Sequence, residues 1–344
     1  MIKPKRLKPG DKVAIVSPSG GAASLFPLSM QGGIDILRNE FSLDIEEYPT
    51  TKMSRNELWQ NPKSRADDIN RAFADKSIRG IITSIGGSDS VRILKYLDID
   101  LIMKNPKLIM GYSDSTSFLS FLNMHGLVTY YGPSVMAGFA YLKNFPEALK
   151  ENKDFLFSSE EYQLKAFPNW AEDYAGWESV ADIGNLKSIN NTFTKHRWLN
   201  KGENTTGGVW GGCVEILEMM VGTFAWPKLD FFEGKVIFLE TSEEKPTPDH
   251  VAYVLRNWGL QGILDRINGI IFAKPKSYSE AEKLELEENV KMIIIEEWGR
   301  QDMNIIMNMD IGHTEPRHII PYGIQIEIDS EKEIIRFVES AFES

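Results

Sequence analysis

The 344-residue sequence has only one cysteine, Cys213. An intramolecular disulfide is therefore excluded, and the composition fits a reducing compartment. No stretch approaches the roughly 20 apolar residues of a membrane span. The apolar run Val13 to Val16, which follows the basic residues near the start, is too short for a secretory signal. We therefore expect a cytoplasmic protein that does not enter the membrane.

Positive charge is also in short supply. Lysine and arginine total 38 against 49 aspartates and glutamates, which gives a formal net charge of -11. Nucleic acid is an improbable partner for such a chain, because its binding depends on basic side chains that displace counterions from phosphates. No low-complexity tract prevents collapse, and 344 residues exceed one comfortable core, so we predict two domains.

The first 140 residues alternate short β-branched runs with longer helical patterns, which is typical of βα units around a parallel sheet. Strands are predicted at residues 12–17, 80–85, 107–111 and 128–131, and a helix at 64–74. Each predicted strand ends in small or turn-forming residues. Open α/β sheets bind ligands at this end of their strands.

Residues 141–204 are polar and rich in aromatic side chains, with no sustained period, and we interpret them as a connection and substrate-facing lobe. The second domain is predicted to span 205–344. It contains predicted helices at 214–220 and 248–258 and strands at 235–240, 268–273 and 304–310. The chain ends in a predicted hairpin of 325–329 and 333–338.

Ser113 is the candidate nucleophile, because it follows an apolar strand and precedes an apolar helical run. Its context, Gly111-Tyr112-Ser113-Asp114-Ser115, resembles a nucleophile elbow, although Ser115 replaces the usual last glycine. The N-terminus of the helix would favour an oxyanion. Alternatively, Ser113 or Asp114 simply caps the helix.

The paired glycines Gly86 and Gly87 follow the strand predicted at 80–85. They allow a ligand to approach the backbone closely, and they can present a second N–H group to an oxyanion. The alternative is a turn that needs glycine for steric reasons.

A serine nucleophile needs a base, and His313 is the best placed of five histidines, in a loop after the strand predicted at 304–310. A structural loop histidine is the alternative. His318 has no acidic or cysteine partner at a recognised spacing, so we predict no metal site. Glu240 closes an apolar strand and is the best candidate to orient the imidazole. Glu243 and Glu244 are expected to be solvated.

These residues belong to a set of motifs that runs along nearly the whole chain. The set comprises Arg65-Ala66-Asp67-Asp68, Ala72-Phe73-Ala74-Asp75, Ile85-Gly86-Gly87, Asn105-Pro106-Lys107, Gly111-Tyr112-Ser113-Asp114, Gly211-Gly212-Cys213 with Glu215, Phe238-Leu239-Glu240-Thr241-Ser242-Glu243-Glu244, Gly312-His313-Thr314 with Pro316, and Pro321-Tyr322-Gly323. In these motifs the sequence resembles the LD-carboxypeptidase family of serine peptidases, and within it the microcin C self-immunity branch.

The resemblance implies a catalytic triad of Ser113, Glu240 and His313 and an oxyanion hole formed by the N–H groups of Gly86 and Asp114. It also implies a homodimer, no metal or other cofactor, and an active site where the two domains meet. The fold expected is α/β. It combines an N-terminal parallel-sheet domain of Rossmann or flavodoxin type with a C-terminal mixed β/α domain of the swivelling, barrel-like kind.

Two substrate classes follow from the resemblance. Murein LD-carboxypeptidases remove the terminal D-alanine of a cell-wall tetrapeptide, whereas immunity-type members cut the amide between an aminoacyl or peptidyl group and a nucleotide-like moiety. The stretch 240–244 favours the second class. An aromatic residue of the lobe would then contact the nucleobase, and the candidates are Trp170, Trp177 and Trp198, although each can equally be a packing residue. A binding protein without catalytic activity is the remaining alternative.

Overall fold

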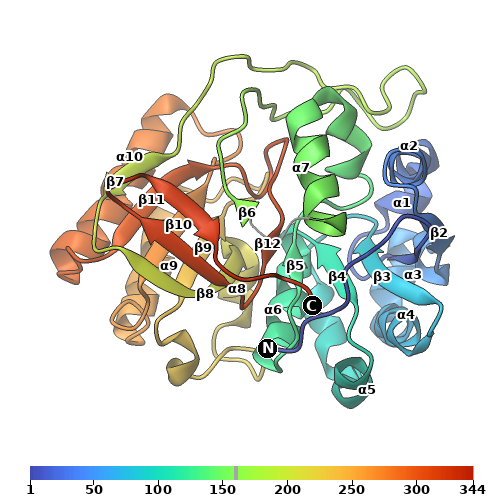
Figure 1. Ribbon diagram of the computed structural model, residues 1–344, viewed down its shortest axis with the longest axis horizontal. Coiled ribbons are helices and arrows are strands. Elements are labelled where there is room, and N and C mark those ends of the chain that lie inside the picture. Colours follow the sequence, from blue (N-terminus) through green and yellow to red (C-terminus); the bar gives the residue numbers. More distant parts are fainter. Residues whose placement is uncertain (159–161, 344) are drawn as a thin grey trace.

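The computed structural model describes residues 1–158 and 162–343, and it contains two β-sheets flanked by helices (Figure 1). The first sheet has the order β12-β5-β4-β3-β1-β2. Its strands are β1 (Lys12–Val16), β2 (Asp44–Glu47), β3 (Ile78–Thr83), β4 (Leu108–Gly111), β5 (Tyr130–Tyr131) and β12 (Ile320–Pro321). The first five are mutually parallel in the flavodoxin-like order, whereas β12 is antiparallel.

The second sheet is mixed and has the order β6-β14-β13-β8-β9-β10-β11-β7. Its strands are β6 (Tyr162–Gln163), β7 (Arg197–Asn200), β8 (Thr205–Cys213), β9 (Val236–Glu240), β10 (Gly269–Ala273), β11 (Asn304–Met309), β13 (Gln325–Asp329) and β14 (Ile334–Phe337). Four central strands, β8 to β11, are parallel, and the outer strands pair antiparallel. The sheet curls into a half-barrel, so the predicted α/β fold class is confirmed.

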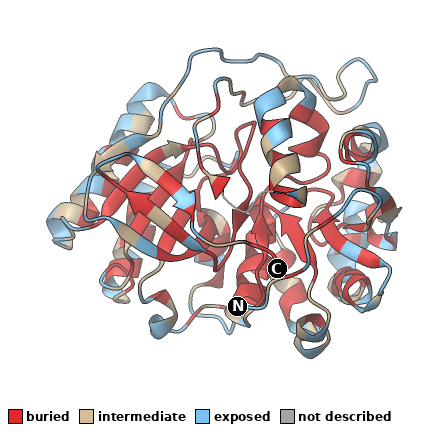
Figure 2. Cartoon of the chain, viewed as in Figure 1, coloured by how far each residue is buried: buried red, intermediate tan, exposed pale blue. Residues whose placement is uncertain are grey.

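Ten α-helices in the described residues cover the sheets. They are α1 (Ala22–Leu25), α2 (Pro27–Asn39), α3 (Arg55–Gln60), α4 (Pro62–Ala74), α5 (Ile99–Lys104), α6 (Thr116–Met124), α7 (Pro146–Phe157), α8 (Val214–Met220), α9 (Pro248–Leu260) and α10 (Glu280–Lys291). Within that part of the chain, no helix is both long and apolar enough to cross a membrane. Buried residues concentrate on the strands, and the exposed ones lie on the outer sides of the helices (Figure 2).

The two sheets are joined through α6, which follows β4 and packs against both β8 and α8. The chain also crosses back, because β12 pairs with β5 after the chain has completed most of the second sheet. The two ends of the chain lie together near β5, where the N–H of Glu343 bonds to the carbonyl of Pro4. The second half of the sequence thus completes the sheet of the first half.

The structure corrects several sequence-based assignments. Residues 141–204 are not uniformly irregular, because Pro146–Phe157 forms helix α7; residues 159–161 of this predicted lobe lie outside the described residues. Strand β3 runs from Ile78 to Thr83, two residues earlier than predicted, so Ile85 belongs to the turn. Strand β8 was missed because its sequence, Thr-Thr-Gly-Gly-Val-Trp-Gly-Gly-Cys, is rich in glycine, which is depleted in strands.

Candidate active site

Ser113 lies two residues after the end of β4, at the start of a short 3-10 turn, Ser113–Ser115, that leads into α6. Its φ angle is 61°, an uncommon value for a residue with a side chain. The N–H of Ser113 donates to the hydroxyl of Tyr131 at 2.9 Å, which fixes the turn from the neighbouring strand. A strained strand-to-helix turn of this kind resembles a nucleophile elbow.

His313 and Glu240 meet Ser113 from the other sheet. Nδ1 of His313 donates to Glu240 Oε2 at 2.7 Å, and Nε2 lies 3.1 Å from Ser113 Oγ. Glu240 ends β9 and is 1% exposed, and its second oxygen accepts from the hydroxyl of Tyr131. The Glu240 contact assigns the Nδ1 proton, so Nε2 faces the serine hydroxyl as a base requires. Tyr131 connects the orienting carboxylate to the backbone of Ser113.

Gly312 determines how closely His313 approaches Glu240. It adopts a φ of +80°, and a Cβ at this position would lie 2.7 Å from the Cβ of Glu240. Any side chain here would be strained by the backbone and would push His313 away from its partner. The glycine before the histidine is therefore a geometric requirement of the contact.

Glu243 lies beside the same histidine, which corrects the expectation that it is only a solvated surface group. Its Oε2 is 3.0 Å from His313 Nε2, although the side chain remains 63% exposed toward the cleft. Burial alone would lower the pKa of His313, but the charges and hydrogen bonds of Glu240 and Glu243 outweigh it and raise the pKa to about 9. The hydrogen bond from His313 in turn lowers the pKa of Glu243 to about 2. The sequence offered no local signal for this contact.

Gly86 and Asp114 border the space around Ser113 Oγ. A Cβ on Gly86 would lie 3.0 Å from Ser113 Cβ and 3.7 Å from the backbone nitrogen of Asp114, so only glycine allows this approach. The buried carboxylate of Asp114 accepts from the N–H groups of Asp89 and Ser90 at 3.1 and 2.9 Å. Burial and the charge of Asp89 raise the pKa of Asp114, against the lowering effect of its hydrogen bonds with Ser90. The Asp114 side chain thus holds the loop that contains Gly86 against the Ser113 turn.

A cleft of about 650 Å³ opens beside Ser113 and His313. It is lined by the loops after β1, β3 and β4, the point where strand order reverses in a flavodoxin-like sheet. Gly87 and Trp177 line it as well. Trp170 borders a different, smaller cavity, and Trp198 lies in β7 against the core. Of the three candidate tryptophans, the structure brings Trp177 to the cleft.

Arg65, the first residue of the motif Arg65-Ala66-Asp67-Asp68, has a structural role beside the cleft. Its side chain is fully buried, and it contacts Asp89 at 2.7 Å and the carbonyl of Pro18 at 3.1 Å. Asp89 also pairs with Arg92 at 2.8 Å. Because Pro18 follows β1 and Asp89 follows β3, this network fixes two of the loops that line the cleft.

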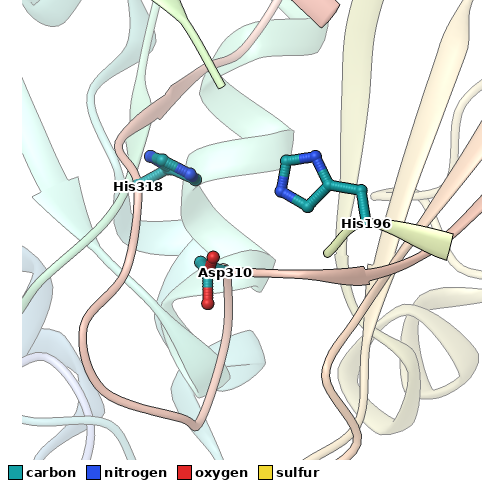
Figure 3. A group of neighbouring side chains, drawn as sticks. All are labelled: His196, Asp310 and His318. Atoms are coloured by element: carbon teal, nitrogen blue, oxygen red, sulfur yellow. The ribbon is translucent and has the colours of Figure 1, made fainter. Parts of the chain in front are cut away.

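A second cluster of titratable groups lies away from the cleft. His196, Asp310 and His318 present ligand atoms within 4.8 Å of one another (Figure 3). These residue types can bind zinc. However, the buried ammonium of Lys274 already pairs with the Asp310 carboxylate, and His318 Nδ1 donates to Glu151 at 2.6 Å. Burial lowers the pKa of His196 to about 3, so this imidazole is neutral. The cluster therefore contains two ion pairs, in which Lys274 supplies the cation for Asp310 and Glu151 supplies the carboxylate for His318. The partners in each pair lie far apart in the sequence.

The protein combines a parallel sheet with a half-barrel, and a serine, a histidine and a glutamate are in buried contact where the two meet. These features define a two-sheet α/β protein with a peptidase-like site. Two family models match this chain, the LD-carboxypeptidase N-terminal domain over residues 13–132 and the LD-carboxypeptidase C-terminal domain over 206–328. The protein belongs to the LD-carboxypeptidase family, a peptidase family.

Similar proteins cover most of the chain. A putative carboxypeptidase of Vibrio cholerae is 25% identical, with 96% of this chain and 95% of the relative aligned. The microcin C7 self-immunity protein MccF of Escherichia coli is also 25% identical, over 80% and 78%. An MccF-like protein from Streptococcus pneumoniae, solved with AMP, has 28% identity and a TM-score of 0.84 and aligns over 96% and 99%. MccF in complex with aspartyl sulfamoyl adenosine has 22% identity and a TM-score of 0.84 over the full length of both chains.

Proposed function

We propose that this protein is a serine amidase that hydrolyses the amide between an aminoacyl or peptidyl group and a nucleotide-like moiety. The observation that carries the proposal is the unbroken series of contacts from Glu240 through His313 to Ser113. A protein that only bound its ligand would not need this series. Its members come from both sheets, with residues 1–140 supplying the nucleophile and residues 205–344 the base and its carboxylate.

In the proposed reaction, neutral His313 takes the proton of Ser113 as Oγ attacks the amide carbonyl carbon. The oxyanion is held by the N–H groups of Gly86 and Asp114, which border the same space. His313 then protonates the leaving nitrogen as the carbon–nitrogen bond breaks. His313 then takes a proton from water as the water oxygen attacks the acyl carbon, and it returns this proton to Ser113 Oγ as the ester bond breaks.

The nucleotide-like part of the substrate is supported by the ligands named for the similar structures, AMP and aspartyl sulfamoyl adenosine. Trp177 supports it as well, because it lines the cleft and contacts Phe26 edge-on, with ring centroids 5.5 Å apart. Its ring can stack on a base. The homodimer and the cytoplasmic location remain predictions.

Two substrates test the proposal. The protein is incubated with an aminoacyl sulfamoyl adenosine and, separately, with a murein tetrapeptide, and the loss of each amide is followed. We expect cleavage of the adenosine compound, and no cleavage by Ser113→Ala, whose fold is checked by its unfolding curve. Cleavage of the tetrapeptide alone would identify a murein LD-carboxypeptidase instead, and an active Ser113→Ala would exclude Ser113 as the nucleophile.

A further inference from the structure

We infer that Glu243 is the binding group for a free α-ammonium on the acyl side of the scissile amide. The substrate class is then an amide of an amino acid whose amine is unblocked. This inference rests on the proposed function and narrows it, because a murein peptide carries an acylated nitrogen at the corresponding position.

The Glu243 carboxylate lies close to the groups that would react. It lies 3.0 Å from His313 Nε2, the same nitrogen that is 3.1 Å from Ser113 Oγ. The side chain is 63% exposed and lines the cleft, so a ligand can reach it without a change of fold. Glu243 therefore borders the place where the carbonyl carbon of a substrate must lie.

Glu243 also affects where His313 carries its protons. The Glu243 carboxylate, 3.0 Å from Nε2, favours the protonated form of the imidazole. To act as a base, His313 must instead present a lone pair to Ser113, and a carboxylate 3.0 Å from that lone pair is repulsive. A cation on the substrate removes the conflict, because it neutralises Glu243 and releases Nε2 for Ser113.

Other charged side chains also face the cleft. Asp89 also lines it, but its carboxylate is held by Arg65 and Arg92. Arg55 and Lys276 line it too; the Lys276 ammonium lies over the ring of Tyr174, 5.5 Å from the centroid, and its charge helps to lower the pKa of Glu243 without forming an ion pair with it. Asp89 is thus paired with arginines, whereas the ion pair described for Glu243 is the one with the candidate base, His313.

The size of an aminoacyl group fits this arrangement. In an amino acid the amine nitrogen lies about 2.5 Å from its own carbonyl carbon, given standard bond lengths and angles. When that carbon is about 3 Å from Ser113 Oγ, the amine is placed within hydrogen-bonding reach of a carboxylate that touches His313. The amine of a longer peptide would be displaced from this position.

The experiment compares alanyl sulfamoyl adenosine with its N-acetyl derivative as substrates of the wild type, of Glu243→Gln and of the control Glu244→Gln. We expect the wild type to prefer the free amine in kcat/KM by about 10- to 100-fold, the range for one hydrogen bond to a charged group. In Glu243→Gln we expect this preference to vanish and cleavage of the acetylated compound to rise, whereas Glu244→Gln should resemble the wild type.

Equal cleavage of both compounds by the wild type would overturn the inference and leave the proposed function standing. The inference would also be overturned if Glu243→Gln lowered kcat/KM by the same factor for both compounds, because Glu243 would then act only through His313. Cleavage of neither compound by the wild type would overturn the proposed function itself, and the inference with it.

Discussion

The reactivity of Ser113 should depend on pH through the two carboxylates that flank His313. The imidazole must be neutral to accept the serine proton, and its pKa is raised to about 9. At pH 7 only about 1% of the free protein then has a neutral His313, compared with about half at pH 9. The rate of attack by Ser113 should therefore rise about 50-fold between these two values.

A neutral fluorophosphonate is a suitable probe, because it reacts with an activated serine and has no group that titrates in this range. The inactivation rate is measured from pH 6 to 10 for the wild type, Glu243→Gln and Glu244→Gln. Removing the Glu243 charge and hydrogen bond should shift the midpoint for His313 to lower pH, so the variant should react faster than the wild type at pH 7. The Glu244→Gln profile should follow the wild type.

Two results would refute this reasoning. A wild-type midpoint near 6.5, the ordinary pKa of histidine, would mean that the carboxylates do not hold the proton on His313. Identical midpoints for the wild type and Glu243→Gln would mean that Glu240 alone sets the pKa, and that the 3.0 Å contact with Glu243 has no energetic consequence.

Three further substitutions test other parts of the site. Tyr131→Phe should lower the free energy of unfolding by about 2–4 kcal/mol, because it leaves the buried N–H of Ser113 unpaired and removes a hydrogen-bond donor from Glu240. Urea unfolding measures this loss, and a value below about 0.5 kcal/mol would contradict the prediction. Gly312→Ala should reduce kcat/KM at least about 100-fold by displacing His313, whereas Gly299→Ala, which also has a positive φ but open space around it, should not. Trp177→Ala should raise KM for an aminoacyl sulfamoyl adenosine about 10-fold with little change in kcat, and an unchanged KM would exclude stacking.

The geometry around Ser113 was predictable because its signals are local. A buried strand, a turn and an apolar helix follow one another in sequence, and the structure has β4, the Ser113 turn and α6 in that order. Glu240 was equally accessible, since a carboxylate that closes an apolar strand is rarely a surface group. His313 could be chosen among the histidines because it follows a glycine in a loop after a predicted strand. Their joint catalytic role remains a prediction.

Contacts between distant segments were not predictable in the same way. Glu243 has polar neighbours in sequence, and its partner is 70 residues downstream. The same applies to Glu151 and His318, whose pairing joins α7 to the loop before β12. In the fold, β8 was missed because its glycines are selected for close packing against Phe238 and Thr116 rather than for strand propensity.

The pairing of β12 with β5 has a consequence for how this protein can be divided. Residues 320–321 belong by sequence to the second half but complete the hydrogen bonding of a strand from the first. A fragment that ended near residue 140 would leave β5 as a bare edge, open to pairing with another chain. Chimeras between relatives should therefore carry this short strand together with the first sheet rather than with the second. During synthesis, the first sheet can therefore be finished only after residues up to 321 have left the ribosome.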